Sequence, residues 1–160
     1  MSAVSYFASL ALLLTNPPAP ASAPPPSDGS TVTINATAAV PLTVKLSNIE
    51  APGKGTLVFL VFDSEETFPR EHDRAIRRYE MTDFGRSASH TFTDLPAGRY
   101  AAVVFQDKNG NGEMDANFIG FPREPLVASG MESMSRPSWK KCSFVLEGGG
   151  YTLNLQLFNQ

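Results

Sequence analysis

The chain has 160 residues, a formal charge of −3 at pH 7, one cysteine and two histidines. So small a charge, without a cluster of Lys and Arg, excludes a protein that binds nucleic acid or anionic membrane by electrostatic attraction. The lone Cys142 excludes an internal disulfide, and the length predicts one domain with a core of its own.

The first 23 residues resemble a secretory signal. They carry no charged side chain and contain an apolar run over residues 4–14, followed by Ala21, Ser22 and Ala23 as a small-residue cleavage site. We predict a signal peptide over 1–23, although its usual basic start is missing, and export to the periplasm or the extracellular space. The alternative is an uncleaved N-terminal anchor. Because no apolar run is long enough to span a bilayer, no transmembrane segment is expected after signal removal.

A Pro/Ala/Ser-rich spacer is predicted over 24–30, and a β-domain over 31–160. Apolar residues in this domain alternate with polar ones, as in strands with one wet face. Residues 57–62 are continuously apolar, which indicates a strand covered on both faces or one near a sheet crossover. The expected strands are 32–34, 42–46, 57–62, 89–93, 100–106, 142–146 and 151–157. About seven short strands between Gly/Pro turns predict an all-β fold, a single antiparallel β-sandwich.

Residues 68–81 depart from the strand pattern. A proline near the start and a dense mixture of charges predict a short surface helix or an ordered loop. Its four arginines either form a basic patch for an anionic ligand or pair with neighbouring carboxylates on a solvated face. We favour the ion pairs.

Residues 107–115 are the stretch most typical of a metal site. Side-chain oxygens recur at every second position, in Asp107, Asn109 and Asn111; Gly112 and Asp115 follow, as at the opening of an EF-hand calcium loop. A hard cation takes about six to eight oxygens, which such a coiled loop supplies from few residues. The competing interpretation is a pair of tight β-turns, because each Asn is followed by Gly.

The twelfth position of the EF-hand pattern, normally a bidentate Glu, is Phe118 here. We expect Glu124, from the segment that returns to the sandwich, or water to complete the shell; Asn117 is a second candidate. The predicted Ca²⁺ ligands are the side chains of Asp107, Asn109, Asn111, Asp115 and Glu124, and the backbone carbonyl of Glu113.

Three further stretches, residues 62–69, 92–101 and 115–125, carry a family resemblance. With the loop, they resemble the exported bacterial domain-of-unknown-function 2141 (DUF2141) family over about residues 42–157; residues 137–139 resemble its proline-serine-aromatic segment. The chain departs from the family pattern over 126–136. The resemblance implies a small exported β-sandwich of the transthyretin-like or carboxypeptidase-regulatory type, and no established activity.

The sequence offers few candidate catalytic residues. His72 and His90 are expected at the surface, and Cys142, on an apolar face, in the core. We therefore expect a non-enzymatic, monomeric protein. Its long loop, from Asp107 to about Lys140, would be pinned by structural calcium and present a binding surface to an unknown ligand.

Two alternatives stay open. The first is a module that binds carbohydrate or an envelope component through Phe118, Phe121 or Trp139 as stacking platforms, although we prefer that these aromatics anchor the loop to the core. The second is a small extracytoplasmic hydrolase that uses His90 or Glu124.

Overall fold

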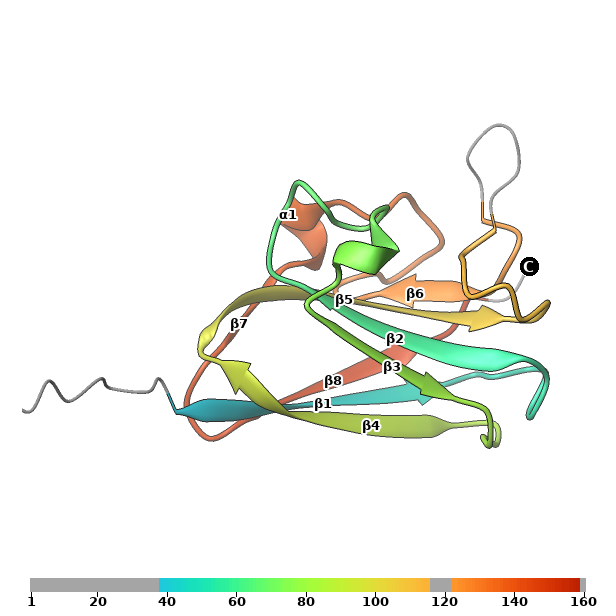
Figure 1. The fold of residues 1–160 in the computed structure, drawn as a ribbon, viewed down its shortest axis with the longest axis horizontal. Helices are drawn as coiled ribbons and strands as arrows, with labels where there is room; N and C mark the ends of the chain where they lie inside the picture. The colour runs from blue at the N-terminus through green and yellow to red at the C-terminus, as the bar shows by residue number, and fades with distance from the viewer. Residues whose placement is uncertain (1–37, 116–121, 159–160) are drawn as a thin grey trace, which may run out of the picture. The chain divides into compact units, whose positions relative to one another are not determined.

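The structure is a computed structural model that describes residues 38–115 and 122–158, and these residues are mostly β (Figure 1). The predicted signal peptide, spacer and first strand lie outside the described residues. The described elements are β1 (Ala39–Ser47), β2 (Thr56–Phe62), η1 (His72–Arg74), β3 (Arg77–Met81), β4 (Ala88–Pro96), β5 (Gly98–Asp107), β6 (Leu126–Ala128), α1 (Trp139–Cys142), β7 (Phe144–Leu146) and β8 (Tyr151–Gln156). None of the helices in this part of the chain is long and apolar enough to cross a membrane.

The strands form two sheets that face each other. One has the order β4-β1-β8; the other has the order β3-β2-β5-β6, with β7 paired to the start of β5. The predicted all-β class and sandwich-like arrangement are confirmed. One pair differs from the antiparallel prediction, because β8 runs parallel to β1, with Leu153 beside Val44.

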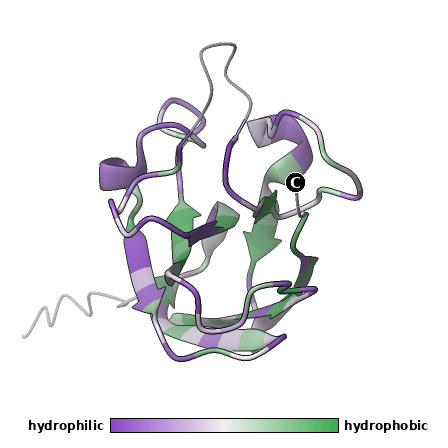
Figure 2. Cartoon of the chain, turned by 90° about the vertical axis from the view of Figure 1, so that its right-hand side faces the viewer, coloured by the Kyte–Doolittle hydropathy of each residue, from purple (hydrophilic) through white to green (hydrophobic). Residues whose placement is uncertain are grey.

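Strand β5 is buried on both faces. Tyr100, Ala102 and Val104 belong to the main core between the sheets, whereas the alternating residues, such as Phe105, belong to a second apolar cluster on the outer face of the larger sheet. Strand β2 is likewise buried over 57–62, as its continuous apolar run predicted. Hydrophobic residues are concentrated in the strands, and many connecting segments are hydrophilic (Figure 2).

The second cluster is covered by η1, α1 and their flanking segments, which lie on the side of the larger sheet away from β1, β4 and β8 (Figure 1). Phe68 packs edge-on against Phe62, with ring centroids 5.6 Å apart, and against Trp139 at 5.9 Å. Trp139 thus anchors α1 to this face of the sheet.

Three local predictions need correction. Only His72–Arg74 is helical in the segment 68–81, as a 3-10 turn, and Arg77–Met81 is strand β3. The middle three residues of β3 are exposed at the edge of the sheet. The strand is therefore polar and lacks the apolar alternation by which strands are predicted. Cys142 is buried as predicted but ends α1 instead of beginning a strand, and the long predicted loop is interrupted by Leu126–Ala128 as β6.

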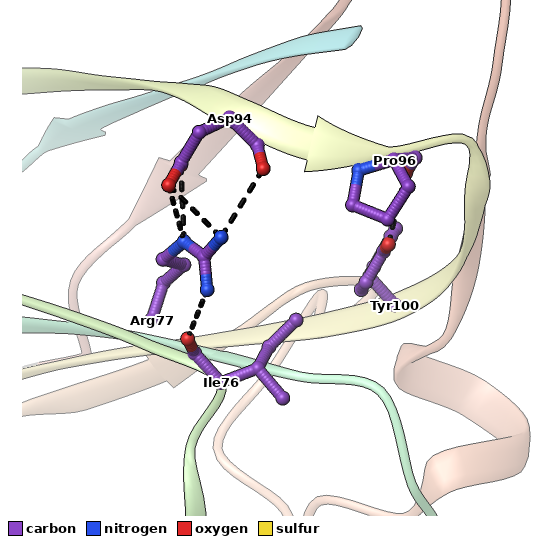
Figure 3. A network of polar contacts seen from close by, with 5 residues as sticks. All are labelled: Ile76, Arg77, Asp94, Pro96 and Tyr100. Carbon is purple, nitrogen blue, oxygen red and sulfur yellow. Dashed lines mark hydrogen bonds and ion pairs between the residues drawn. The ribbon is translucent and has the colours of Figure 1, made fainter. Parts of the chain in front are cut away.

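A side-chain contact links β3 of one sheet to β4 of the other (Figure 3). The Nε of Arg77 donates to both carboxylate oxygens of Asp94, at 3.0 and 2.9 Å, and its Nη2 donates to the Asp94 carbonyl at 3.1 Å. At the corner that leads from β4 into β5, the Tyr100 hydroxyl donates to the Pro96 carbonyl at 2.9 Å. Ion pairs within the arginine-rich segment are present as predicted, between Arg74 and Glu71 and between Arg78 and Glu80, whereas Arg77 pairs with Asp94 outside the segment.

Glycine is required where the turn before β2 meets the end of β5. Gly55 has φ +74°, and a Cβ added there would lie 1.9 Å from the backbone carbonyl oxygen of Asp107. Gly53, in the same turn, has φ +66° but open space around it. A residue with a Cβ would be strained by the positive φ at either position, but only at Gly55 would the Cβ also clash with the backbone.

We expect Gly53→Ala to lower the free energy of unfolding by about 1 kcal/mol, the cost of a left-handed residue with a Cβ. Gly55→Ala should cost at least about 1 kcal/mol more, because the Asp107 backbone must also move. Urea unfolding of both variants measures the difference. Equal losses would show that the approach of Gly55 to β5 imposes no constraint.

Candidate metal centre

Asp107 opens the candidate site as the last residue of β5, where it pairs with Thr56 and is 2 % exposed. Its Oδ1 accepts the Gly110 N–H at 2.6 Å, and its Oδ2 accepts the Gly112 N–H at 2.7 Å. Both glycines have positive φ, +74° and +78°, which a residue with a Cβ rarely adopts. The backbone that follows Asp107 therefore turns around its buried carboxylate.

The two asparagines contribute to the loop in two ways. Each Oδ1 accepts a backbone N–H two residues further on, from Asn111 to Asn109 at 3.1 Å and from Glu113 to Asn111 at 2.9 Å. Each Nδ2 donates to a separate oxygen of Asp115, at 2.6 Å from Asn109 and 3.2 Å from Asn111. The loop thus has the hydrogen-bonded turns of the competing interpretation, and it also brings together the side chains of three predicted ligands, Asn109, Asn111 and Asp115.

Glu124 returns to this loop although it is distant in sequence. It is 4 % exposed, its Oε1 accepts the Lys108 N–H at 2.8 Å, and its Oε2 accepts the Asp115 N–H at 3.4 Å. The Arg123 N–H also donates to the Asp115 carbonyl at 2.7 Å. One carboxylate therefore holds both ends of the loop.

The electrostatics of the site are dominated by negative charge. Burial raises the pKa of Glu124 above its ordinary value, and the charges of Asp107 and Asp115 add to this, while its two backbone hydrogen bonds act in the opposite direction. The three ion pairs among the described residues lie within η1 and its flank or on β3, and none of them includes these carboxylates. The buried carboxylates of Asp107 and Glu124 therefore repel each other, and neither is paired with a basic side chain in these ion pairs.

The donor set fits a hard cation. All the predicted ligands are carboxylate, amide or carbonyl oxygens, the ligands that calcium prefers, and none is a thiolate or imidazole. The amide N–H groups of Asn109 and Asn111 donate to Asp115, and these hydrogen bonds stabilise its charge without neutralising it. Among the described residues, no group of three or more His, Cys, Asp or Glu side chains is arranged so that it could hold a metal ion.

The remaining predicted residues divide into two groups. Glu113 lies in the loop with an exposed side chain, which is compatible with the predicted backbone ligand. Asn117, Phe118 and Phe121 lie outside the described residues. Because the ring of Trp139 packs against Phe68, its placement agrees with the anchoring interpretation.

The histidines are less exposed than the sequence predicted. His72 stacks on Phe105, with centroids 5.4 Å apart, and His90 stacks on Tyr79 at 3.5 Å. Burial lowers the pKa of both, and the Arg78 charge lowers that of His72 further. Two shallow cavities in the described part, of about 390 and 240 Å³, are lined by residues around Lys45 and around Arg136, and neither is lined by a histidine or by Glu124.

Sequence reasoning missed one residue that contacts the loop. The Nη2 of Arg78, on β3, donates to the Gly112 carbonyl at 2.9 Å. No local pattern could have indicated this contact, because the residues are 34 positions apart and meet only through the pairing of β3 with β2.

Comparison with known proteins gives one match. The family model described as "Uncharacterized protein conserved in bacteria (DUF2141)" matches residues 44–154, a range that contains all the predicted ligands. No match is found among curated proteins or solved structures.

The raised pKa of Glu124 leads to a prediction about pH. An acid whose pKa is higher in the folded protein than in the unfolded chain favours folding when protonated, and that contribution is lost as the pH rises through the folded pKa. In chelator, the stability advantage of the unchanged protein over Glu124→Gln should therefore shrink as the pH rises above about 4.5. Urea unfolding of both proteins across this range measures the difference, in which the titrating groups that are not coupled to Glu124 cancel. A difference that is constant or grows with pH would contradict the prediction.

Proposed function

The chain belongs to the DUF2141 family of uncharacterised bacterial proteins, and for this member we propose a structural calcium-binding loop in an exported, non-enzymatic β-sandwich protein. The loop would use the side chains of Asp107, Asn109, Asn111 and Asp115 and the carbonyl of Glu113, with Glu124 or water completing the shell. The protein would present a binding surface to a ligand of the cell envelope or its surroundings.

The observation that supports calcium most directly is the buried negative charge. Asp107 and Glu124 are 2 % and 4 % exposed, and the ion pairs of the described residues leave both without a cationic partner. Backbone N–H groups stabilise the Glu124 carboxylate only partly, because burial and, to a lesser degree, the charges of Asp107 and Asp115 still raise its pKa. A divalent cation beside Asp107 and Asp115 would compensate this charge.

A bound cation would also hold a long connection in place. The segment 108–125 joins β5 to β6, and within its described part no residue belongs to a helix or a named strand. Connections longer than about 12–15 residues are normally functional or disordered unless something orders them. Few carboxylates favour an affinity in the range of roughly micromolar to millimolar, suited to calcium outside the cell.

Export is supported by the uncharged, apolar start of the sequence. Because the lone cysteine excludes an internal disulfide, a metal ion would be a useful cross-link in an exported protein. A non-enzymatic role is supported by the surroundings of the histidines. His90 is stacked between aromatic rings, with Phe92 edge-on at 4.6 Å, which suits packing better than proton transfer.

We expect millimolar calcium to raise the melting temperature relative to chelator. A calcium concentration ten times its dissociation constant adds about 1.4 kcal/mol to the free energy of unfolding. Asp115→Asn should lose most of this rise, because it removes a ligand charge and leaves the side chain the same shape. Differential scanning calorimetry, with isothermal titration for the affinity, makes the measurement. Magnesium should give a smaller rise, since it dehydrates reluctantly.

The matched control is Glu113→Gln, which removes one negative charge from the same loop at a side chain that is exposed. Its response to calcium should equal that of the unchanged protein, because only the backbone carbonyl of Glu113 is a proposed ligand. Identical melting curves in chelator and calcium would exclude the site. An equal loss in both variants would indicate general screening of loop charge instead of coordination.

A further inference from the structure

Arg78 is the residue of the arginine-rich segment that the proposed calcium site leaves unexplained. It lies on the edge strand β3, where it pairs with Leu60 of β2. Its Nε contacts Glu80 Oε1 at 2.7 Å, and its Nη2 donates to the Gly112 carbonyl at 2.9 Å. One planar guanidinium therefore connects the edge of the larger sheet to the turn of the loop.

The contact is made at one of the two loop glycines with positive φ. Gly112 has φ +78°, and its N–H donates to Asp107 Oδ2 at 2.7 Å. Arg78 fixes the carbonyl on the other side of the same residue, and a Cβ added at Gly112 would be 3.6 Å from Arg78 Nη2. Both peptide groups of Gly112 are thus held, one by a proposed ligand and the other by β3.

The orientation of this second peptide group affects the proposed calcium site. The Gly112 carbonyl and the Glu113 N–H belong to one planar unit, and that N–H donates to Asn111 Oδ1 at 2.9 Å. Because this peptide plane is fixed, the backbone of Glu113 has fewer conformations before the cation binds. Coordination by the Glu113 carbonyl then costs less conformational entropy. Among the hydrogen bonds of residues 108–115 to the rest of the described chain, the Arg78 contact is the one that comes from β3.

The charge of Arg78 would by itself repel a cation, and Glu80 offsets it. The pair is held at 2.7 Å on a surface where the Arg78 side chain is about one-third exposed and that of Glu80 about one-half. Lysine could not reproduce this arrangement, because its single ammonium lacks the fixed fork that reaches a carboxylate and a carbonyl in different directions.

We infer that Arg78 is a positioning residue of the calcium loop, which orients the Gly112–Glu113 peptide for coordination and couples the loop to the edge strand β3. The inference rests on the proposed calcium function. Because coupling between two sites is reciprocal, calcium on the loop should in turn stabilise β3.

The test compares Arg78→Lys with Arg77→Lys. Both keep the charge and lie on the same strand, but Arg77 binds Asp94 of β4 and makes no described contact with the loop. Isothermal titration with calcium, well below the melting temperature, should show a dissociation constant about fivefold higher for Arg78→Lys, which corresponds to about 1 kcal/mol, the net contribution of one typical hydrogen bond. Arg77→Lys should lower the melting temperature and leave the calcium affinity unchanged.

Hydrogen exchange gives a second readout. Calcium should slow amide exchange in β3 of the unchanged protein and of Arg77→Lys, and should have no such effect on β3 in Arg78→Lys. A purely structural role for Arg78 would alter the basal exchange rate without altering its response to calcium.

The outcomes separate the inference from the function on which it rests. If the unchanged protein binds calcium and Arg78→Lys binds it equally or more tightly, the positioning role is wrong and the calcium site stands. Equal weakening in both variants would also overturn the inference, as a general effect of destabilisation. If the unchanged protein does not bind calcium, both the proposed function and the inference fail.

Discussion

The pairing of β5 on both of its edges is the constraint on which the rest of the domain depends. It is hydrogen-bonded along most of its length to β2, and on its other edge to β7 near its start and to β6 further along. Both faces are apolar and buried, one against the sheet that contains β1 and the other beneath η1 and α1. A strand enclosed on all sides cannot shift its register without exposing a whole set of core residues. The position of its last residue, Asp107, is therefore fixed by the core.

The chemistry of the loop follows from that fixed position. Because Asp107 is buried where the strand ends, its carboxylate must find hydrogen-bond donors nearby, and the nearest are the backbone N–H groups of Gly110 and Gly112. The asparagines then bring Asp115 across the turn, and Glu124 closes the ends of the loop. The site is thus a property of the strand end together with the returning segment, and it lies outside any helix–loop–helix unit.

The sequence predicted the elements whose surroundings impose a pattern. The sequence indicates β2 by its continuous apolar run, β8 by its alternation, and the loop by the spacing of its side-chain oxygens. It also indicates Glu124, because the loop lacks the carboxylate of its twelfth position. Strand β3 was not readable, because it is an exposed edge whose charges resemble those of a surface helix. Arg78 could not be assigned to the loop for a related reason. Its contact depends on the register of β3 with β2, which no local pattern encodes.

The parallel pairing of β1 with β8 joins the first and last described strands of the domain. During synthesis, β1 can pair with β4 early, but its other edge stays open until the final strand has emerged. Leu153 and Leu155, which help to fill the main core, arrive with that strand. Closure therefore waits for a contact between residues about one domain length apart, an arrangement that slows folding. The main core therefore stays incomplete, with one edge of β1 unpaired, until β8 is in place.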